Sequence, residues 1–337
     1  MSIPSRWGLV ALIAIAIAVP RGSWAQEKPA LIIGGADDRG FELAGPQAVI
    51  VTANRIVIIE EGAPFFRVLS ATGALIQSFG RKGAGPGEIS NATFWYDSAH
   101  REIVAFDRGN SRVSYYALGD TIHFARSHPS SVLAFGGCVI DGTPWVLSGR
   151  GSLIAELKLD ADRFVAARKM GEERWLNPDF AQPALRRFGI SAGVSLQCDE
   201  RTRTAVVFSA LFGEAHVLSL TTGKDQLIKL LDFIPSHIEG NANGYSYEYP
   251  ASGIFDEFTG TMATSAGVEA LVAHYTARTR ERDAPDSYRR VVILPDATQW
   301  VVGRSTWKPM AVARDGVYCY SSDPAPTIAK FSSGRCP

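Results

Sequence analysis

A histidine and a glutamate stand two residues apart in the segment PSHIEG, residues 235–240. His237 and Glu239 could serve as an acid–base pair, because an imidazole and a carboxylate within hydrogen-bonding reach can exchange protons with a substrate. No nucleophile marks the neighbouring sequence, and a solvated loop with two polar residues explains the segment more simply. We therefore assign no catalytic residue.

The glycine-rich segment FGRKGAGPGEIS, residues 79–90, could cradle a phosphate. A nucleotide-binding P-loop places its lysine after the second glycine, followed by Ser or Thr at the start of a helix. Here Lys82 comes early and the strand-like run NATFWYD follows. The segment instead predicts a turn of the chain, for which the glycines permit positive φ angles and Pro86 adds stiffness.

The spacing of cysteines and histidines predicts neither a metal site nor a cofactor. There is no Cys-x-x-Cys pair, and the six histidines do not form a ligand pattern; they are His100, His123, His128, His216, His237 and His274. The cysteines are Cys138, Cys198, Cys319 and Cys336. An even number in an exported chain predicts two disulfides, and four cysteines permit three pairings.

The first 25 residues have the features of a secretory signal peptide. Arg6 precedes an apolar run from Leu9 to Val19, and the triplet Ser-Trp-Ala stands before Gln26. The apolar run is shorter than the roughly 20 residues of a membrane span. We expect cleavage near Gln26 and a secreted or periplasmic mature chain with no membrane anchor; an uncleaved N-terminal anchor is the alternative.

The charge balance gives no reason to expect a nucleic-acid partner. The 337-residue chain has 34 basic and 34 acidic residues, and removal of Arg6 and Arg21 with the signal leaves 32 against 34. Binding to a phosphate backbone needs a basic face, which a nearly neutral chain does not predict. The hydrophobic fraction of 46% is sufficient for a large core.

A repeat organises the mature chain. β-branched and aromatic runs bounded by turn residues predict strands throughout, and long helical periodicity is absent. The turn before the second strand of each unit recurs at spacings of 46, 42, 60, 65 and 48 residues, anchored at Asn54, His100, Gly142, Thr202, Gly267 and Asp315. This period is close to that of a four-stranded propeller blade. We predict an all-β, six-bladed β-propeller that forms a single domain over residues 26–337.

The two ends of the chain are expected to share the last blade. The sixth unit ends one strand short, at MAVARD, GVYCYS and TIAKFSS, whereas an additional strand, Pro29–Gly35, precedes the first unit. Pairing this strand with the last blade would close the ring and remove an exposed sheet edge. The topology also predicts the disulfides. Cys138 and Cys198 both end the first strand of adjacent blades, so they should pair, and Cys319 should pair with Cys336.

The second unit resembles a known family. GRKGAGPGEI followed by EIVAFDRGNSRVSYYALGDTI is similar to the repeat of NHL-type (TolB-like) six-bladed β-propellers, with Asp107, Asn110 and Arg112 at the polar positions of that repeat. The resemblance implies that these three polar residues have a structural role and hold the turn between the second and third strands. The first unit keeps a partial version, with Glu60 and Arg67, and the other four units have lost it. Because the family includes binding modules, lyases and lactonases, the resemblance implies the fold and no particular activity.

A metal-dependent hydrolase or lyase of the lactonase type would need several oxygen ligands on the inner strands. The segments expected there are PQAVIVT, ATFWYDS, LAFGGCVI, GVSLQC, TGTMATS and PMAVAR. They offer Asp97, Gln47 and Gln197, which are few for a cation. This function is therefore the alternative.

Three long insertions, residues 170–189, 233–253 and 276–290, should emerge on one face of the disc. Long loops of this kind often carry function. They contain residue types enriched in binding sites, namely Trp175, Arg186, Arg187, His237, Glu239, Tyr245, Tyr247, Tyr249, Arg280 and Tyr288. We predict a monomeric, non-enzymatic binding module for an unidentified protein or small-molecule ligand. The alternative explanation is that the insertions merely cover the blade tops.

Overall fold

In the computed structural model, the described residues are 27–337 except for 36–40, 149–150, 183–192, 211, 242–243, 249, 251, 265, 277–284 and 324. The predicted signal peptide, residues 1–25, lies outside this part of the chain. Within it, the one helical element is a short 3₁₀ helix, η1 (Pro178–Ala181). No helix among the described residues has the length and apolar character needed to cross a membrane.

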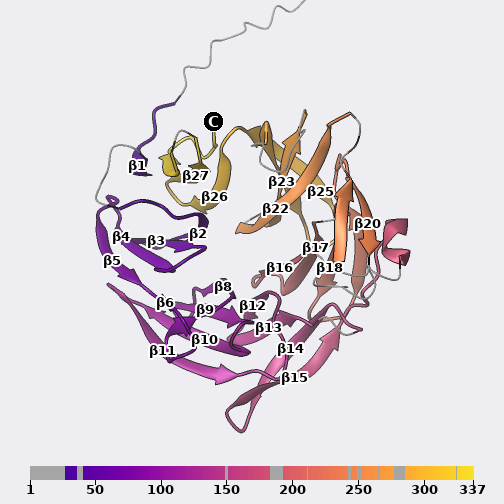
Figure 1. Ribbon diagram of the computed structural model, residues 1–337, viewed down its shortest axis with the longest axis horizontal. Coiled ribbons are helices and arrows are strands. Elements are labelled where there is room, and N and C mark those ends of the chain that lie inside the picture. Colours follow the sequence, from indigo (N-terminus) through magenta and orange to yellow (C-terminus); the bar gives the residue numbers. More distant parts are fainter. Residues whose placement is uncertain are drawn as a thin grey trace, which may run out of the picture.

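The described residues form six four-stranded antiparallel sheets arranged around a central axis as a six-bladed β-propeller (Figure 1). Blade 1 contains β2 (Pro46–Val51), β3 (Arg55–Glu60), β4 (Phe66–Ser70) and β5 (Leu75–Phe79), and blade 2 contains β8 (Ala92–Asp97), β9 (Glu102–Asp107), β10 (Arg112–Leu118) and β11 (Ile122–Pro129). Blade 3 contains β12 (Gly137–Ile140), β13 (Thr143–Leu147), β14 (Ile154–Asp160) and β15 (Arg163–Met170), and blade 4 contains β16 (Val194–Asp199), β17 (Thr204–Ser209), β18 (Glu214–Ser219) and β19 (Asp225–Lys229). Blade 5 contains β22 (Phe255–Thr264), β23 (Gly267–Tyr275), β24 (Ser287–Ile293) and β25 (Gln299–Ser305), and blade 6 contains β26 (Lys308–Ala313), β27 (Gly316–Ser321), β28 (Thr327–Phe331) and β1 (Leu31–Gly34). We call the four strands of each blade a to d, from the axis outward.

The outer strand of blade 6 comes from the start of the described chain. β1 pairs antiparallel with β28, with Leu31 opposite Lys330 and Gly34 opposite Thr327. Ile33 is buried in a cluster that also contains Ile56 of blade 1 and Ile328 of blade 6. The strand expected over Pro29–Gly35 is therefore present over four of those residues, and it covers the edge of β28.

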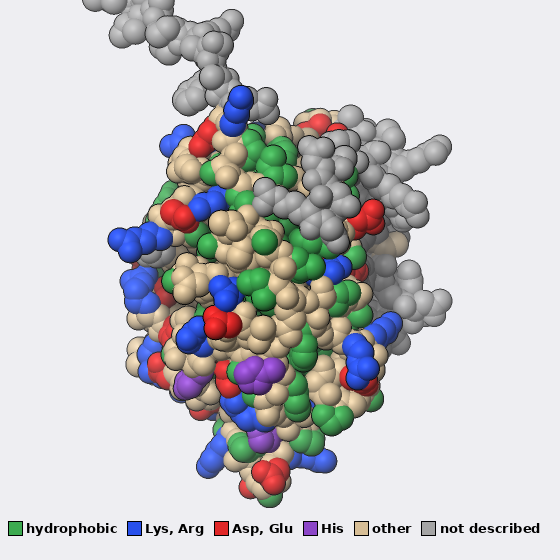
Figure 2. Space-filling view, turned by 90° about the vertical axis from the view of Figure 1, so that its left-hand side faces the viewer, with side chains coloured by type: hydrophobic (Ala, Val, Ile, Leu, Met, Phe, Trp, Pro, Cys, Tyr) green, Lys and Arg blue, Asp and Glu red, His purple; other side chains and the backbone are tan. Residues whose placement is uncertain are grey.

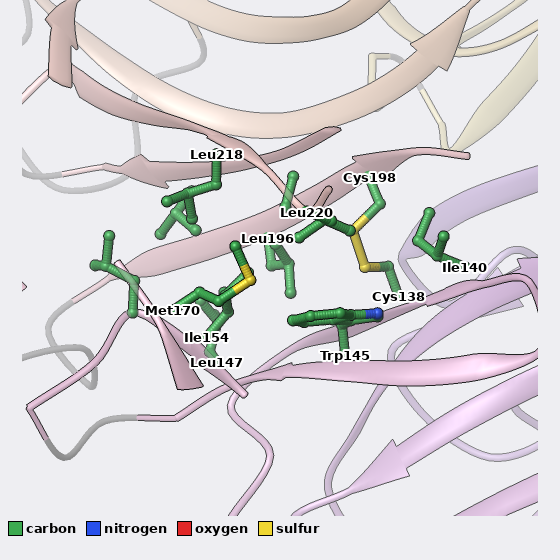
Figure 3. Close-up of a cluster of buried hydrophobic side chains, with 13 residues drawn as sticks. Cys138, Ile140, Trp145, Leu147, Ile154, Met170, Leu196, Cys198, Leu218 and Leu220 are labelled. Carbon is green, nitrogen blue, oxygen red and sulfur yellow. A yellow bond between two sulfur atoms is a disulfide. The ribbon is translucent and has the colours of Figure 1, made fainter. Parts of the chain in front are cut away.

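The core lies between neighbouring blades. Many b and c strands are buried on both faces because a blade packs against a neighbour on each side, and β3 and β9 accordingly read as nearly continuous apolar runs. One cluster between blades 3 and 4 includes Trp145, Leu196 and Leu218 around the Cys138–Cys198 disulfide (Figure 3). Packing between flat blades thus supplies most of the apolar burial that stabilises the ring.

Both predicted disulfides are present. Cys138 of β12 is bonded to Cys198 of β16, with the two Cα atoms 6.1 Å apart. Cys319 of β27 is bonded to Cys336 in the C-terminal tail, with a Cα separation of 5.8 Å. The first bond joins the inner strands of adjacent blades, and the second holds the tail against blade 6.

The glycine-rich segment connects the outer strand of blade 1 to the inner strand of blade 2. Within it, β6 (Arg81–Lys82) and β7 (Glu88–Ile89) make a short parallel pair. Gly87 has a φ of +74°, and a Cβ there would lie 3.0 Å from the Cβ of Phe124, so the position favours glycine on both counts.

The polar residues of the second repeat bind this connection. Asp107 is fully buried, and its carboxylate accepts hydrogen bonds from the backbone N–H groups of Ser90 and Asn91 at 3.3 and 3.1 Å. Asn110 Nδ2 donates to the carboxylate of Asp107 at 2.6 Å. The Arg112 guanidinium donates to the backbone carbonyls of residues 84 and 85 at 3.0 Å each. These bonds hold the incoming chain against the b–c turn and occupy several of its backbone groups, as expected for a segment that turns the chain.

A buried acid performs the same task in three other blades, although the sequence pattern is not repeated there. Glu60 accepts from Ala44 N at 2.5 Å in blade 1, Glu214 from Leu176 N at 2.6 Å in blade 4, and Asp256 from Ile234 N at 3.0 Å in blade 5. All three carboxylates are buried. The acids come from strands b, c and a respectively. Because these acids stand at different positions of the repeat, an alignment of the six units along the sequence does not reveal that they have the same role.

The outer side of the disc carries mixed charge. Figure 2 shows basic and acidic side chains interspersed on the side of the molecule formed by the first blades, with no area of a single sign. This distribution agrees with the formal net charge of zero.

Candidate functional site

A cavity of about 510 Å³ runs along the propeller axis. Its walls are the six inner strands, β2, β8, β12, β16, β22 and β26, together with the two residues before β12 and one residue each of β3 and β23. The cavity extends along most of the inner strands, from Lys308 at the start of β26 to Val51 at the end of β2. This volume lies within the range of small-molecule sites, which is roughly 300–1,000 Å³.

The two mouths of the cavity differ. All inner strands enter from the d–a connections and leave toward the a–b turns, so the first residues of each inner strand lie on the face where the d–a and b–c connections emerge. We call this the insertion face, because the two longest connections between blades, after β15 and β19, and the longest b–c connection, between β23 and β24, emerge there. Lys308, Gln47, Thr93 and Ser195 are each the first or second residue of their strands. All four line the cavity near this mouth.

Lys308 is the one charged side chain among the described residues that line the cavity. It is partly buried, and no hydrogen bond or ion pair joins it to the described part of the chain. Burial lowers the pKa of its ammonium group. Lys308 was not predicted as a site residue from the sequence, because the inner strand was expected to begin at Pro309. The signal was the lysine directly before that apolar run.

Three consecutive inner strands contain a β-bulge within the cavity wall. Gln47 is the extra residue in β2, Thr259 in β22 and Met310 in β26. The other three inner strands pair with their neighbours in unbroken register. Bulges occur preferentially beside functional sites, where they redirect side chains. The irregular sector, blades 5, 6 and 1, is centred on the strand that carries Lys308.

Of the three residues expected to offer oxygen ligands, Gln47 and Gln197 line the cavity and Asp97 does not. Asp97 lies at the a–b turn, where its carboxylate is 2.8 Å from Nδ1 of His100 and accepts a backbone bond from Ala99 N at 3.1 Å. Gln197 lines the cavity, but its Oε1 accepts a hydrogen bond from Thr261 Oγ1 at 2.9 Å. Within the described ranges no group of three His, Cys, Asp or Glu side chains could hold a metal ion.

The first two insertions meet on the outside of blade 4. The 3₁₀ helix η1 belongs to the first insertion. In the second, β20 (His237–Asn241) and β21 (Gly244–Glu248) form an antiparallel hairpin where a loop was expected. His237 Nδ1 lies 3.2 Å from Asp179 Oδ2 of η1, and Figure 1 shows η1 beside β20. His237 therefore has an acidic partner from another insertion, while Glu239 stands two residues further along the same strand.

The first insertion is held down on blade 4 by a buried histidine. His216 Nδ1 lies 2.8 Å from Asp225 Oδ1, and its Nε2 donates to the carbonyl oxygen of Arg174 at 2.7 Å. Trp175 packs edge-on against the His216 ring, with centroids 4.8 Å apart, and also contacts Phe212. Much of the Trp175 surface is therefore used in packing, and its remaining surface is only partly exposed.

The other residues proposed for the binding face are only partly described. Tyr288 of β24 packs beside Phe255, Ala273 and Tyr275, and burial, followed by the nearby Tyr320, raises the pKa of its phenol. Tyr320 is the cross-strand partner of Lys308, so Tyr288 stands near the same mouth of the cavity. Backbone positions alone are described for Tyr245 and Tyr247 of β21 and for Glu239. Arg186, Arg187, Tyr249 and Arg280 lie outside the described residues.

Comparisons with known proteins agree with the fold. No protein-family model matches the chain, and no curated protein matches it. A solved structure called a "putative exported protein", from Bacteroides fragilis, is 12% identical with a TM-score of 0.54, covering 87% of this chain and 85% of its own. A member of the DUF4221 family from Bacteroides vulgatus is 8% identical with a TM-score of 0.56, covering 90% and 96%. At this identity the likeness shows the six-bladed propeller fold alone.

Proposed function

We propose that this chain is an exported, non-enzymatic binding module that takes a small-molecule ligand into the insertion-face mouth of its central cavity. The observation that carries the proposal is the cavity of about 510 Å³, bordered at that mouth by three bulged strands and by polar side chains that have no partner among the described residues. Two disulfides and the likeness to a protein called exported support a location outside the cytoplasm.

The long insertions would form the outer rim of the site. They emerge on the same face as Lys308, and the first two are joined through His237 and Asp179. The rim would contribute the aromatic and arginine side chains expected from the sequence. A rim built from several insertions can also be larger than the cavity mouth, which suits a ligand only part of which enters the channel.

A metal-dependent hydrolase or lyase remains the alternative function. It would require several oxygen ligands converging in the channel. The described lining offers amide and hydroxyl oxygens and no carboxylate, so we favour binding. Metal analysis of the purified protein and thermal unfolding with and without Ca²⁺ separate the two. Stoichiometric metal or a large Ca²⁺-dependent rise in Tm would reverse our preference.

The test of channel binding is a small-molecule screen by thermal unfolding of the mature chain. Compounds that raise Tm are then measured against Thr93→Trp, which fills the channel, and against Thr121→Trp, a matched control. Thr93 is an exposed residue of the channel wall, and Thr121 is an exposed residue of the outer c–d turn of the same blade. We expect Thr93→Trp to abolish stabilisation and Thr121→Trp to keep it. Equal stabilisation of both variants would place the site elsewhere.

Alanine variants test the rim separately. Trp175→Ala, Tyr247→Ala and Arg187→Ala should weaken binding if the insertions touch the ligand. Trp175→Ala also removes packing against His216 and Phe212, so its folding must be checked by circular dichroism. Unchanged affinity in all three variants would confine the site to the channel or to the opposite face.

A further inference from the structure

Lys308, in the wall of the cavity, is a cation with no partner in the part of the chain that the structure describes. The side chain is partly buried, and none of the described residues makes an ion pair or hydrogen bond with it. A buried, unpaired charge is costly, and proteins normally pair or replace it. The other partly buried cations that the structure describes are paired with acids; they are Arg55, Arg67, Arg112, Arg290 and Lys330. Lys308 is thus the exception, and it faces the space where a ligand would lie.

The polar groups at the same mouth can donate hydrogen bonds. The Gln47 amide and the Thr93 and Ser195 hydroxyls line the cavity, and no partner is recorded for them among the described residues. Each can donate to a negatively charged oxygen. No carboxylate stands in the described lining to compete for the ammonium. The mouth therefore presents one positive charge together with neutral donors.

Two of the β-bulges lie among the polar residues at this mouth. Gln47 and Met310 are the extra residues of β2 and β26, the neighbouring inner strands of blades 1 and 6. A bulge interrupts the alternation of a strand and turns a side chain away from its regular direction. The two bulges lie beside Lys308, one within two residues of it in its own strand. Backbone irregularity and the unpaired cation thus coincide in space, as expected for a built site.

Beyond the mouth most of the side chains that line the wall are apolar. Val49, Trp95, Leu196, Met262 and Met310 line the cavity, and Val49, Leu196, Met262 and Met310 are buried. Apolar and aromatic walls with a few placed polar groups are typical of sites for small organic molecules. The flexible thioethers of Met262 and Met310 and the indole of Trp95 can also pack against an aromatic ring of a ligand.

We infer that the channel binds a small, largely apolar monocarboxylate, whose carboxylate group is held by Lys308 at the insertion-face mouth and whose body lies along the apolar wall. One ammonium matches one negative charge, so the site suits a monoanion better than a phosphorylated polyanion. The lowered pKa of Lys308 is consistent with a group whose charged form gains its full stabilisation when an anion arrives. This inference rests on the proposed channel binding and adds the ligand class.

The experiment compares acids with their neutral amides. The probes are benzoate, phenylacetate, indole-3-acetate, 2-naphthoate and octanoate, each paired with its primary amide, titrated into the mature protein by calorimetry at neutral pH. We expect at least one acid to bind ten-fold or more tightly than its amide. Lys308→Met should remove this preference, Lys308→Arg should keep most of it, and Lys158→Met should leave it unchanged. Lys158 is an exposed lysine of β14 on the blade's outer half, which makes it a matched control.

Two results would overturn the inference. If no acid binds more tightly than its amide, the channel does not select anions. If an acid is preferred but Lys308→Met keeps the preference, Lys308 is not the anchor. If the amides bind as tightly as the acids and Thr93→Trp abolishes their binding, the proposed function, binding in the channel, still holds, and only the preference for an acid is wrong. If compounds raise the Tm of the Thr93→Trp variant as much as that of the wild-type chain, the proposed function itself is wrong.

Discussion

Glu214 and Leu176 are 38 residues apart in the chain, and the buried carboxylate of Glu214 accepts a hydrogen bond from the backbone N–H of Leu176 at 2.6 Å. This bond fastens the first insertion to blade 4. Glu214→Ala should lower the free energy of unfolding by about 1–2 kcal/mol, because a charge-assisted bond is lost. Urea unfolding measures the change, and Glu172→Ala, an exposed acid in the same insertion, should change it by less than about 0.5 kcal/mol. Equal effects of the two variants would mean that the bond contributes nothing.

The same glutamate should make stability depend on pH. Burial raises the pKa of Glu214 in the folded chain, so the folded state holds its proton to a higher pH than the unfolded state does. Its contribution to the unfolding free energy is complete below the pKa of the unfolded chain, about 4.3, and is lost as pH rises through the raised value. The stability of the wild-type chain relative to Glu214→Gln should therefore fall between pH 4 and pH 7. Urea unfolding across that range measures the free energy of unfolding at each pH. The curve for Glu172→Gln should run parallel to that of the wild type, and a difference between the wild type and Glu214→Gln that does not change with pH would contradict the expectation.

Lys308→Met should stabilise the protein at neutral pH. Because burial lowers the pKa of Lys308, the folded state disfavours the ammonium form. The contribution of this group is present above the unfolded pKa, about 10.4, and is lost as pH falls through the lowered value. At pH 7 the free energy of unfolding of Lys308→Met should be about 1 kcal/mol higher than that of the wild type. This difference should shrink as the pH approaches about 10.5. Lys158→Met serves as the control; a destabilised Lys308→Met variant would show that the lysine is held by favourable contacts.

The two disulfides should differ in their contribution to stability. Cys138 and Cys198 are separated by 60 residues, and Cys319 and Cys336 by 17. The chain-entropy model gives about 4 kcal/mol for the longer loop and about 3 kcal/mol for the shorter one. Chemical unfolding of the paired serine variants should therefore show the larger loss for Cys138→Ser/Cys198→Ser. The reverse order would show that packing around the bonds outweighs loop closure, and peptide mapping without reductant checks the pairing itself.

The strand β1 should be required for folding. A chain that begins at Phe41 would lack Leu31–Gly34 and leave the edge of β28 exposed, and an unpaired edge favours aggregation. It should also lose the burial of Ile33 against blades 1 and 6. We expect this chain to aggregate or to melt at a much lower temperature than a chain that begins at Glu27. Equal Tm values for the two chains would show that β1 is dispensable.

Much of the fold could be predicted from the sequence because it depends on local patterns. The strands of the second blade, Glu102–Asp107 and Arg112–Leu118, have the expected bounds, since apolar runs and turn residues mark them along the chain. The six units and both disulfide pairings also follow from spacing and strand order. The hairpin formed by β20 and β21 was missed, because its strands lack the apolar alternation of a blade.

The candidate site was decided by the tertiary structure. Lys308 and Gln47 are more than 250 residues apart in sequence, and only closure of the ring brings blades 6 and 1 together around one mouth. The bulges at Gln47, Thr259 and Met310 depend on how each inner strand pairs with its neighbour, which no single strand's pattern records. The sequence by itself therefore determined the blades and the crossing segments, because these rest on short-range alternation and turn chemistry, and it determined the disulfides because their pairing follows from the order of the strands. The channel, with Lys308 in its wall, arises from contacts between distant segments, which exist only in the folded ring.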